Sequence, residues 1–191
     1  SINTMAFNNG KAPTDDVRVR EAFALAMDAP AIKEMLMHIK LFQRTGWFDI
    51  GTPLARTPAE LDKIPGFRSP TSDDIARAKQ LLIDAGYPGC KGMPVLEMPI
   101  RDLPDRHLIV PAVQAMLKQN LGCESKTSVH QTSAIAEVIR EGKFHVILRN
   151  FGSGGVPGSG GGAVVLKCDE PNNKGGIRYC NREFDKVVDA Y

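Results

Sequence analysis

The fold of this chain follows from the stretch Glu137–Gly152, EVIREGKFHVILRNFG, near its carboxyl end. Apolar residues recur at helical spacing across Thr132–Gly142, which predicts a short amphipathic helix. The apolar run Phe144–Leu148 predicts a strand, and it leads directly into the glycine-rich segment Arg149–Ala163. A helix followed by an apolar strand and a loop is typical of the α/β class.

The same pattern extends through the rest of the chain. Strands are predicted for Ile2–Asn8, Met93–Ile100 and Cys123–Val129. Helices are predicted from Asp15 or Asp16 to Met27, from Asp28 to Met37, from a Ser72 cap to Gly86, and from Pro104 to Asn120. The alternation of strands and helices in the second half favours parallel pairing. We therefore expect a mixed, mostly parallel sheet flanked by helices.

Composition and charge narrow the class of protein. The chain has 191 residues, of which 42% are hydrophobic and 24% charged, which is ordinary for one soluble globular domain or lobe. The formal net charge of +2 and the scattered basic residues give no electrostatic case for nucleic acid as a partner. No apolar run reaches the length of a membrane span.

The four cysteines predict disulfides better than a metal site. They form no CxxC pair, and none lies at zinc-finger spacing from a histidine. Cys168 and Cys180 bracket a short polar loop, and Cys90 and Cys123 each precede one of two neighbouring predicted strands. We expect these two pairs to bridge, which favours an oxidising compartment. Four free thiols in a reducing compartment remain the alternative.

The glycine-rich segment is compatible with a linker, a phosphate loop or a ligand-binding loop. A Walker loop requires a lysine directly after its glycines, and none occurs before Lys167. A dinucleotide-binding GxGxxG fingerprint requires glycines that open a helix, and the glycine spacing here does not. A loop inside the fold, whose backbone approaches a ligand closely, fits the flanking apolar residues better than a linker does. Six candidate contacts follow in order: Arg149, Asn150, Phe151, Gly152, Ser153 and Gly154. A solvated charge for Arg149 and core packing for Phe151 are the alternatives.

A second group of candidates follows the strand that ends at Ile100. Arg101 and Arg106 are forked donors suited to a carboxylate, although surface arginines are common. His107 lies near the start of the long helix, where it faces a cleft or is simply exposed. No catalytic motif accompanies any of the four histidines. The only tryptophan, Trp47, lies in the mostly irregular stretch Leu41–Arg68 and is a further candidate contact.

Several stretches, taken in order, resemble one known family. DDVRVREAFALAMDAPAI resembles the helix pair that opens the second lobe of peptide- and nickel-type solute-binding proteins of ABC transporters. SDDIARAKQLLIDAGYPG, VPAVQAMLKQNLGCESKTSV, EVIREGKFHVILRNFG and GIRYCNREFDKVVDA resemble the segments that follow in that family. The resemblance covers most of the chain and implies one lobe, residues 1–191, of a type II periplasmic-binding-protein-like fold. Both ends look truncated, and an N-terminal lobe is expected as a partner.

The resemblance also carries expectations about the site. It implies that the glycine-rich segment faces the cleft between two lobes, where the family has a tryptophan and an aspartate that holds a peptide's amino group. This chain has Phe151 and no aspartate there. The family's basic residue for a ligand carboxylate corresponds to Arg106 or His107. The implied ligand is a peptide or similar small solute, captured by hinged closure and passed to an ABC permease, with no cofactor and no catalysis.

Two other functions stay open at this point. One is a small α/β enzyme that uses the glycine-rich loop around an anionic substrate, with His107 as its base. The other is a receptor domain without a role in transport. The family resemblance places the protein outside the cytoplasm, either in a periplasm or attached by lipid to the outer face of the cell membrane.

Overall fold

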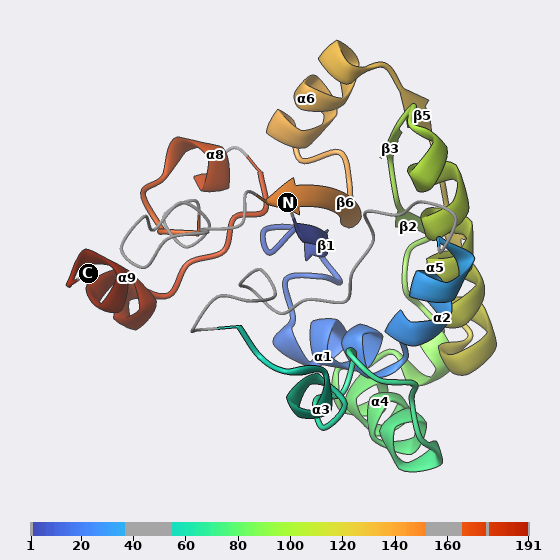
Figure 1. The fold of residues 1–191 in the computed structure, drawn as a ribbon. Helices are drawn as coiled ribbons and strands as arrows, with labels where there is room; N and C mark the ends of the chain where they lie inside the picture. Colours follow the sequence, from blue (N-terminus) through green and yellow to red (C-terminus); the bar gives the residue numbers. More distant parts are fainter. Residues whose placement is uncertain (1, 37–54, 152–165, 175, 191) are drawn as a thin grey trace.

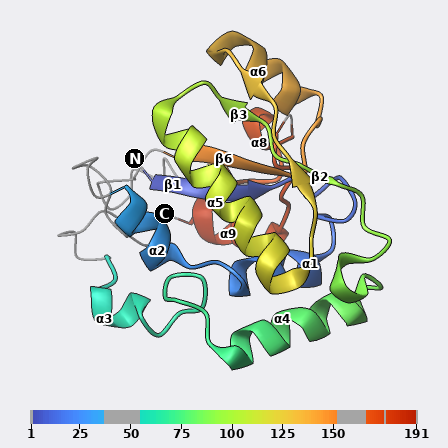
Figure 2. The same cartoon turned by 90° about the vertical axis from the view of Figure 1, so that its right-hand side faces the viewer.

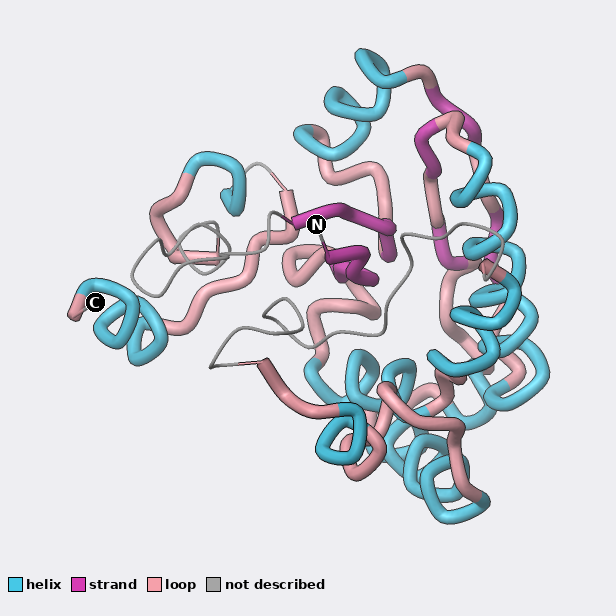
Figure 3. The backbone as a smooth tube through the Cα atoms, viewed as in Figure 1, coloured by secondary structure: helices cyan, strands magenta, loops and turns pink. Residues whose placement is uncertain are grey.

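A computed structural model describes residues 2–36, 55–151, 166–174 and 176–190. It is an α/β structure in which helices surround short strands (Figure 1, Figure 3). The strands are β1 (Ile2–Phe7), β2 (Leu96–Glu97), β3 (Ile100–Arg101), β4 (Ser125–Lys126), β5 (Val129–His130) and β6 (Val146–Phe151). The helices are α1 (Val17–Leu25), α2 (Ala29–Met35), α3 (Pro58–Leu61), α4 (Ser72–Asp84), the 3₁₀ turn η1 (Pro88–Cys90), α5 (Pro104–Leu121), α6 (Thr132–Arg140), α8 (Pro171–Lys174) and α9 (Arg182–Asp189).

Parallel pairing joins the two strand regions that flank α5. β2 pairs with β4 and β3 pairs with β5, both in parallel, as the strand–helix–strand order predicts. Backbone bonds continue between the short strands, since the Met98 amide donates to Lys126 and the Ile100 amide donates to Ser128. The β2–β4 and β3–β5 pairings therefore continue into one another along the same two segments of chain. Helix α5 connects these two segments.

The last strand of the predicted strand–helix alternation, β6, differs from the prediction in its bounds and in its pairing. It runs over Val146–Phe151 instead of Phe144–Leu148, and it pairs antiparallel with β1, with Ile2 opposite Phe151 and Phe7 opposite Val146. Arg149, Asn150 and Phe151 accordingly belong to a strand and not to the glycine loop. The amide of His145 donates to the Glu97 carbonyl and so links the start of β6 to β2.

Two hydrophobic clusters cover the opposite faces of β6, because successive side chains of a strand point to opposite sides. Val146 joins the main cluster, which lies among α1, α4, α5 and β2 and whose largest buried side chains include Phe23, Leu82, Leu96 and Leu117. Ile147 joins a smaller cluster with Ala6, Ile135, Phe144 and Ile177. In Figure 1, β2 and β3 lie between α5 and the β1–β6 pair, and both Figure 1 and Figure 2 show α6 above β6 at the top of the view.

The helix boundaries follow local chemistry. Asp16 is the residue that caps α1, and its side chain accepts from the Arg18 amide. The predicted Ser72 cap of α4 is wrong by one residue: Thr71 accepts from the Asp74 amide, and Asp74 accepts from the Thr71 amide, in a capping box. Glycine at 122 ends α5 with φ of +82°.

Gly122 gives a test of the α5 terminus. Its left-handed φ is strained for any residue with a Cβ, and a Cβ here would stand 3.1 Å from the Gly89 carbonyl oxygen. We expect Gly122→Ala to lower the free energy of unfolding by about 1–2 kcal/mol in urea titrations. Gly86→Ala is the control, since Gly86 has φ of +88° with nothing within 4 Å. A smaller loss at Gly122 than at Gly86 would contradict the role of the Gly89 contact.

Asp74 gives a pH-dependent prediction. A hydrogen bond from Arg68, followed by bonds from Thr71, lowers the pKa of this carboxyl from 3.8 to about 2. Because the pKa is lower in the folded state, the stabilisation is complete above pH 3.8 and is lost as the pH falls towards 2. Asp74→Asn should therefore cost about 1–2 kcal/mol at pH 7 and almost nothing near pH 2.

The matched control is Asp73→Asn, which changes the neighbouring acid in the same first turn of α4. Denaturant unfolding of the two variants from pH 2 to pH 7 separates their effects. An equal cost for both variants at pH 7 would contradict the specific role of Asp74.

The Arg178 side chain lies against two glycines from distant parts of the chain, Gly10 and Gly142. A Cβ on Gly10 would lie 2.7 Å from its Cδ, and one on Gly142 would lie 2.6 Å from Nη1. Nearby, the buried Asn8 donates to the carbonyls of Gly142 and Phe144. These contacts join the loop after β1 to the turn between α6 and β6.

Candidate functional site

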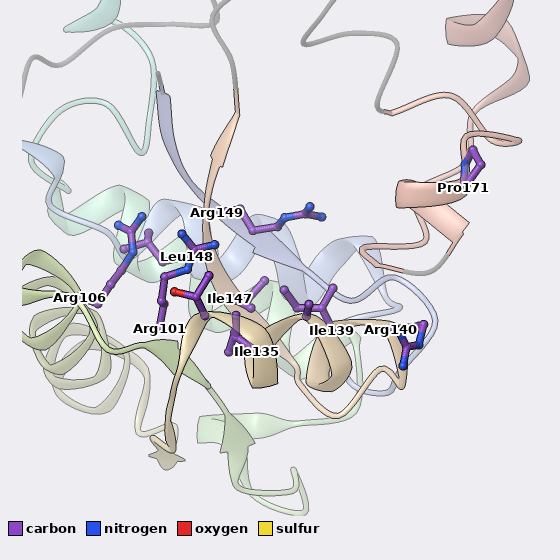
Figure 4. Close-up of a pocket in the computed structure, with 11 residues that line it drawn as sticks. Arg101, Arg106, Ile135, Ile139, Arg140, Ile147, Leu148, Arg149 and Pro171 are labelled. Carbon is purple, nitrogen blue, oxygen red and sulfur yellow. The ribbon is translucent and has the colours of Figure 1, made fainter.

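A cavity of about 460 Å³ lies where β3, α5, α6 and β6 meet (Figure 4). Its position follows from the topology, because β3 ends at Arg101 and α5 begins three residues later. Open α/β sheets place ligand sites at such carboxyl ends of strands. The described residues that line it are Arg101, Arg106, Thr132, Ile135, Ala136, Ile139, Arg140, Ile147, Leu148, Arg149 and Pro171.

Arg106 is the most buried cation of the cavity, with 4% of its surface exposed. It lies in the first turn of α5, and its Nη1 is 3.0 Å from Oδ2 of Asp105. Burial is the main cause that lowers the pKa of Arg106; the Asp105 carboxylate raises it, and the charge of Arg101 lowers it further. Arg101 and Arg106 line the same cavity from neighbouring elements, β3 and α5.

The other three arginines differ in environment. Arg149 is half-buried in β6, opposite Thr4 of β1, and burial lowers its pKa. Arg101 is exposed at the end of β3, and among the described residues it has no ion pair. Arg140 lies in the last turn of α6, where it is paired with Glu137. All four guanidinium groups are charged at neutral pH.

The apolar part of the cavity comes from two elements. Ile135 and Ile139 lie one turn apart on α6, and Ile147 and Leu148 belong to β6. Ile135 and Ile147 also belong to the smaller hydrophobic cluster, which fixes the position of α6 against the strand. The cavity therefore combines an apolar surface from α6 and β6 with four arginines, and its volume is that of a small-molecule site.

The structure brings together three of the residues predicted from the sequence and separates others. Arg101, Arg106 and Arg149 line one cavity, although they lie in three different elements. His107 does not line it; its side chain is exposed, and its Nε2 is 2.8 Å from Oδ1 of Asp102. Asn150 lies in β6, as does Phe151. Trp47, Gly152, Ser153 and Gly154 lie outside the described residues.

Sequence reasoning missed the contribution of α6. Ile135, Ile139 and Arg140 line the cavity, yet the sequence shows them only as one face and the last turn of an amphipathic helix. The four-residue spacing of the two isoleucines is the one signal that places them on a common face. His145, by contrast, has the structural role expected from its place in an apolar strand. It is buried, and its Nδ1 accepts from the Glu97 amide at 2.8 Å.

Disulfides join Cys90 to Cys123 and Cys168 to Cys180, with Cα–Cα distances of 5.0 and 4.5 Å. These are the two pairs favoured by the sequence. Within the described ranges, no group of three or more metal-ligating side chains could hold an ion. Nor does any described helix have the length and apolar character needed to cross a membrane.

A family model described as bacterial extracellular solute-binding proteins, family 5 Middle, matches residues 1–173. The chain belongs to this family. Its members bind solutes and act outside the cytoplasm, and the fold is the periplasmic-binding-protein fold. The comparison with curated proteins gave no match.

Solved structures agree with this assignment. The murein tripeptide binding protein MppA of Escherichia coli is 25% identical, with a TM-score of 0.80 over 98% of this chain and 35% of its own. The oligopeptide-binding proteins OppA of Burkholderia pseudomallei and Haemophilus influenzae are 18% and 21% identical, with TM-scores of 0.77 and 0.70. They are covered over 36% and 35% of their chains, with 98% and 97% of this chain aligned. The chain thus spans about a third of the length of these proteins.

Proposed function

We propose that this chain is the ligand-closing lobe of a two-lobe solute receptor that delivers its ligand to an ABC permease. The cavity around Arg106 would contact the solute, and closure of a second lobe over it would complete the site. The receptor would act outside the cytoplasm, in a periplasm or attached by lipid at the outer face of the membrane. No bond would be made or broken in the process.

The observation that carries this proposal is a cavity of small-molecule size at the carboxyl end of β3, with a buried cation at its wall. Arg106 lies near the start of the long helix, where the family resemblance implies a contact to a ligand carboxylate. A peptide-like solute is the leading class, since the 25%-identical MppA is titled a murein tripeptide binding protein. The exposed position of His107, away from the cavity wall, counts against an enzyme that uses it as a base.

An open cavity on a single lobe supplies only part of the contacts of a closed receptor, so the 191-residue chain should bind its solutes weakly. Ligand-observed NMR detects such binding at millimolar concentrations. The panel comprises short peptides, small organic acids and oligosaccharides, titrated into the chain. We expect at least one class to bind, and Arg106→Gln to weaken that binding by about tenfold or more.

Arg77→Gln is the matched control, because Arg77 is an exposed arginine on α4 that does not line the cavity. It should leave the affinity unchanged. Circular dichroism and thermal unfolding establish that both variants are folded. The proposal is wrong if no member of the panel binds the folded chain, or if the two variants bind equally well.

A further inference from the structure

A buried histidine joins the β1–β6 pair to β2. His145 directly precedes β6, and 3% of its surface is exposed. Its backbone amide donates to the Glu97 carbonyl at 2.9 Å, and its backbone carbonyl accepts from the Asn8 amide at 3.0 Å. Its side chain completes this junction, because Nδ1 accepts from the Glu97 amide at 2.8 Å. Both backbone groups of Glu97 are therefore bound to this one residue.

The side-chain bond exists only while the imidazole is neutral. A ring nitrogen that accepts a hydrogen bond carries no proton, so the neutral ring of His145 has its proton on Nε2. In the charged ring both nitrogens are donors, and Nδ1 would then face the Glu97 N–H with an N–H of its own. Protonation of His145 therefore breaks the bond and leaves the Glu97 amide without its acceptor.

The surrounding charges also oppose a charged ring at this position. The Glu97 carboxylate lies 3.9 Å from Nδ1 and favours the protonated form, but two lysines share it. Lys11, in the loop after β1, lies 2.5 Å from one of its oxygens, and Lys126 of β4 lies 3.5 Å from the other. Burial is the main cause that lowers the pKa of His145, followed by Lys11. The carboxylate and a backbone hydrogen bond with Ala12 raise it, and Lys126 lowers it.

We propose that His145 is a positioning residue for the cavity, and that it holds β6 in place only in its neutral form. β6 begins at the next residue, and its Ile147, Leu148 and Arg149 line the cavity. A proton on His145 releases the start of β6 from β2 and so disturbs this wall. A solute bound there is held less tightly in an acidic medium. Only this last step rests on the proposed function.

The pH dependence of folding tests the neutral state. Because the pKa of His145 is lower in the folded chain, its stabilisation is complete above the unfolded value of 6.5 and is lost as the pH falls below that value. His145→Asn is the matched variant: its Oδ1 can replace Nδ1 as the acceptor, and it does not titrate. Urea unfolding at pH 7.5 and pH 5.5 gives the folding equilibrium constants. We expect the ratio of the wild-type constant to that of the variant to fall about tenfold.

A second variant separates the acceptor from the bulk of the ring. His145→Leu neither titrates nor accepts a hydrogen bond, so at pH 7.5 it should be less stable than His145→Asn. Circular dichroism establishes that both variants are folded. A ratio that stays constant between pH 7.5 and pH 5.5, or a leucine variant as stable as the wild type, would overturn the role of His145.

NMR of the wild-type chain links the junction to the cavity without any variant or ligand. Nitrogen shifts of the ring report the protonation of His145, and the amide shifts of Ile147 and Leu148 report the wall. We expect the neutral Nε2–H form at pH 7.5, and wall amides that shift together with protonation of the ring. A charged ring at pH 7.5, or wall amides that do not follow the ring, would count against the proposal.

Solute binding is measured last, with Ala-Ala-Ala, glutarate and maltotriose as probes of the three classes in the panel. A probe that binds the wild type should bind more weakly at pH 5.5 than at pH 7.5, and His145→Asn should show a smaller change. Equal pH effects in the two proteins would remove the effect on the solute. If no probe binds at either pH, the proposed function fails, whereas the unfolding and NMR results still decide the role of His145.

Discussion

Replacing Phe23 by alanine should lower the free energy of unfolding by about 3–5 kcal/mol, the usual cost of removing a buried ring. Phe23 is completely buried in α1 and belongs to the main hydrophobic cluster. Its ring centroid lies 6.2 Å from that of Phe7 on β1. The ring therefore connects the helix layer to the strand that pairs with β6, and its loss would leave a cavity between two layers.

The control is Val17→Ala at the start of the same helix. Val17 is 62% exposed, so its truncation should change the free energy of unfolding by less than about 0.5 kcal/mol. Urea unfolding monitored by circular dichroism gives both values. Similar, small losses for the two variants would mean that α1 does not pack as the structure describes.

Removing the disulfide between Cys90 and Cys123 should cost about 3–4 kcal/mol, the largest effect expected from any crosslink in the described part of the chain. The two cysteines are 33 residues apart, and a crosslink of that span strongly restricts the unfolded chain. Both side chains are also buried: Cys90 is 8% exposed and Cys123 is fully buried. The double variant with alanine at both positions avoids a free thiol.

The second disulfide is the matched comparison. Cys168 and Cys180 are 12 residues apart, so their removal should cost less, about 3 kcal/mol. Mass spectrometry after alkylation without reductant checks that all four cysteines are protected in the starting protein. Alkylated thiols in the folded chain, or an unchanged unfolding midpoint in the Cys90–Cys123 double variant, would contradict the crosslink.

Local elements were predictable from the sequence because their signals are local. Asp16, Gly86 and Gly122 mark helix ends through cap chemistry that acts within a few residues. The parallel pairing of β2 and β3 with β4 and β5 followed from the single helix between them. The wrong prediction of Ser72 as the cap of α4 also has a local cause. Thr71 and Ser72 both carry a hydroxyl that can cap a helix, and Thr71 is the cap because it forms the capping box with Asp74.

Long-range pairing was not predictable in the same way. Ile2–Phe7 and Val146–Phe151 are far apart in sequence, and nothing in either stretch specifies that they pair or run antiparallel. That pairing extends β6 to Phe151 and places Arg149 in a strand. The role of Arg140 was hidden for another reason: a cation in the last turn of a helix is explained well enough by the helix dipole. Only the tertiary structure brings it to the same cavity as Arg101.

The position of Arg178 over Gly10 constrains how this sequence can evolve. An alanine at position 10 requires the Arg178 side chain to shift, since the added Cβ would stand 2.7 Å from the Cδ of Arg178. A shorter side chain at position 178 removes the obstacle. The order of substitutions therefore matters: a lineage that first shortens residue 178 can later accept a larger residue at position 10, whereas the reverse order passes through a destabilised intermediate.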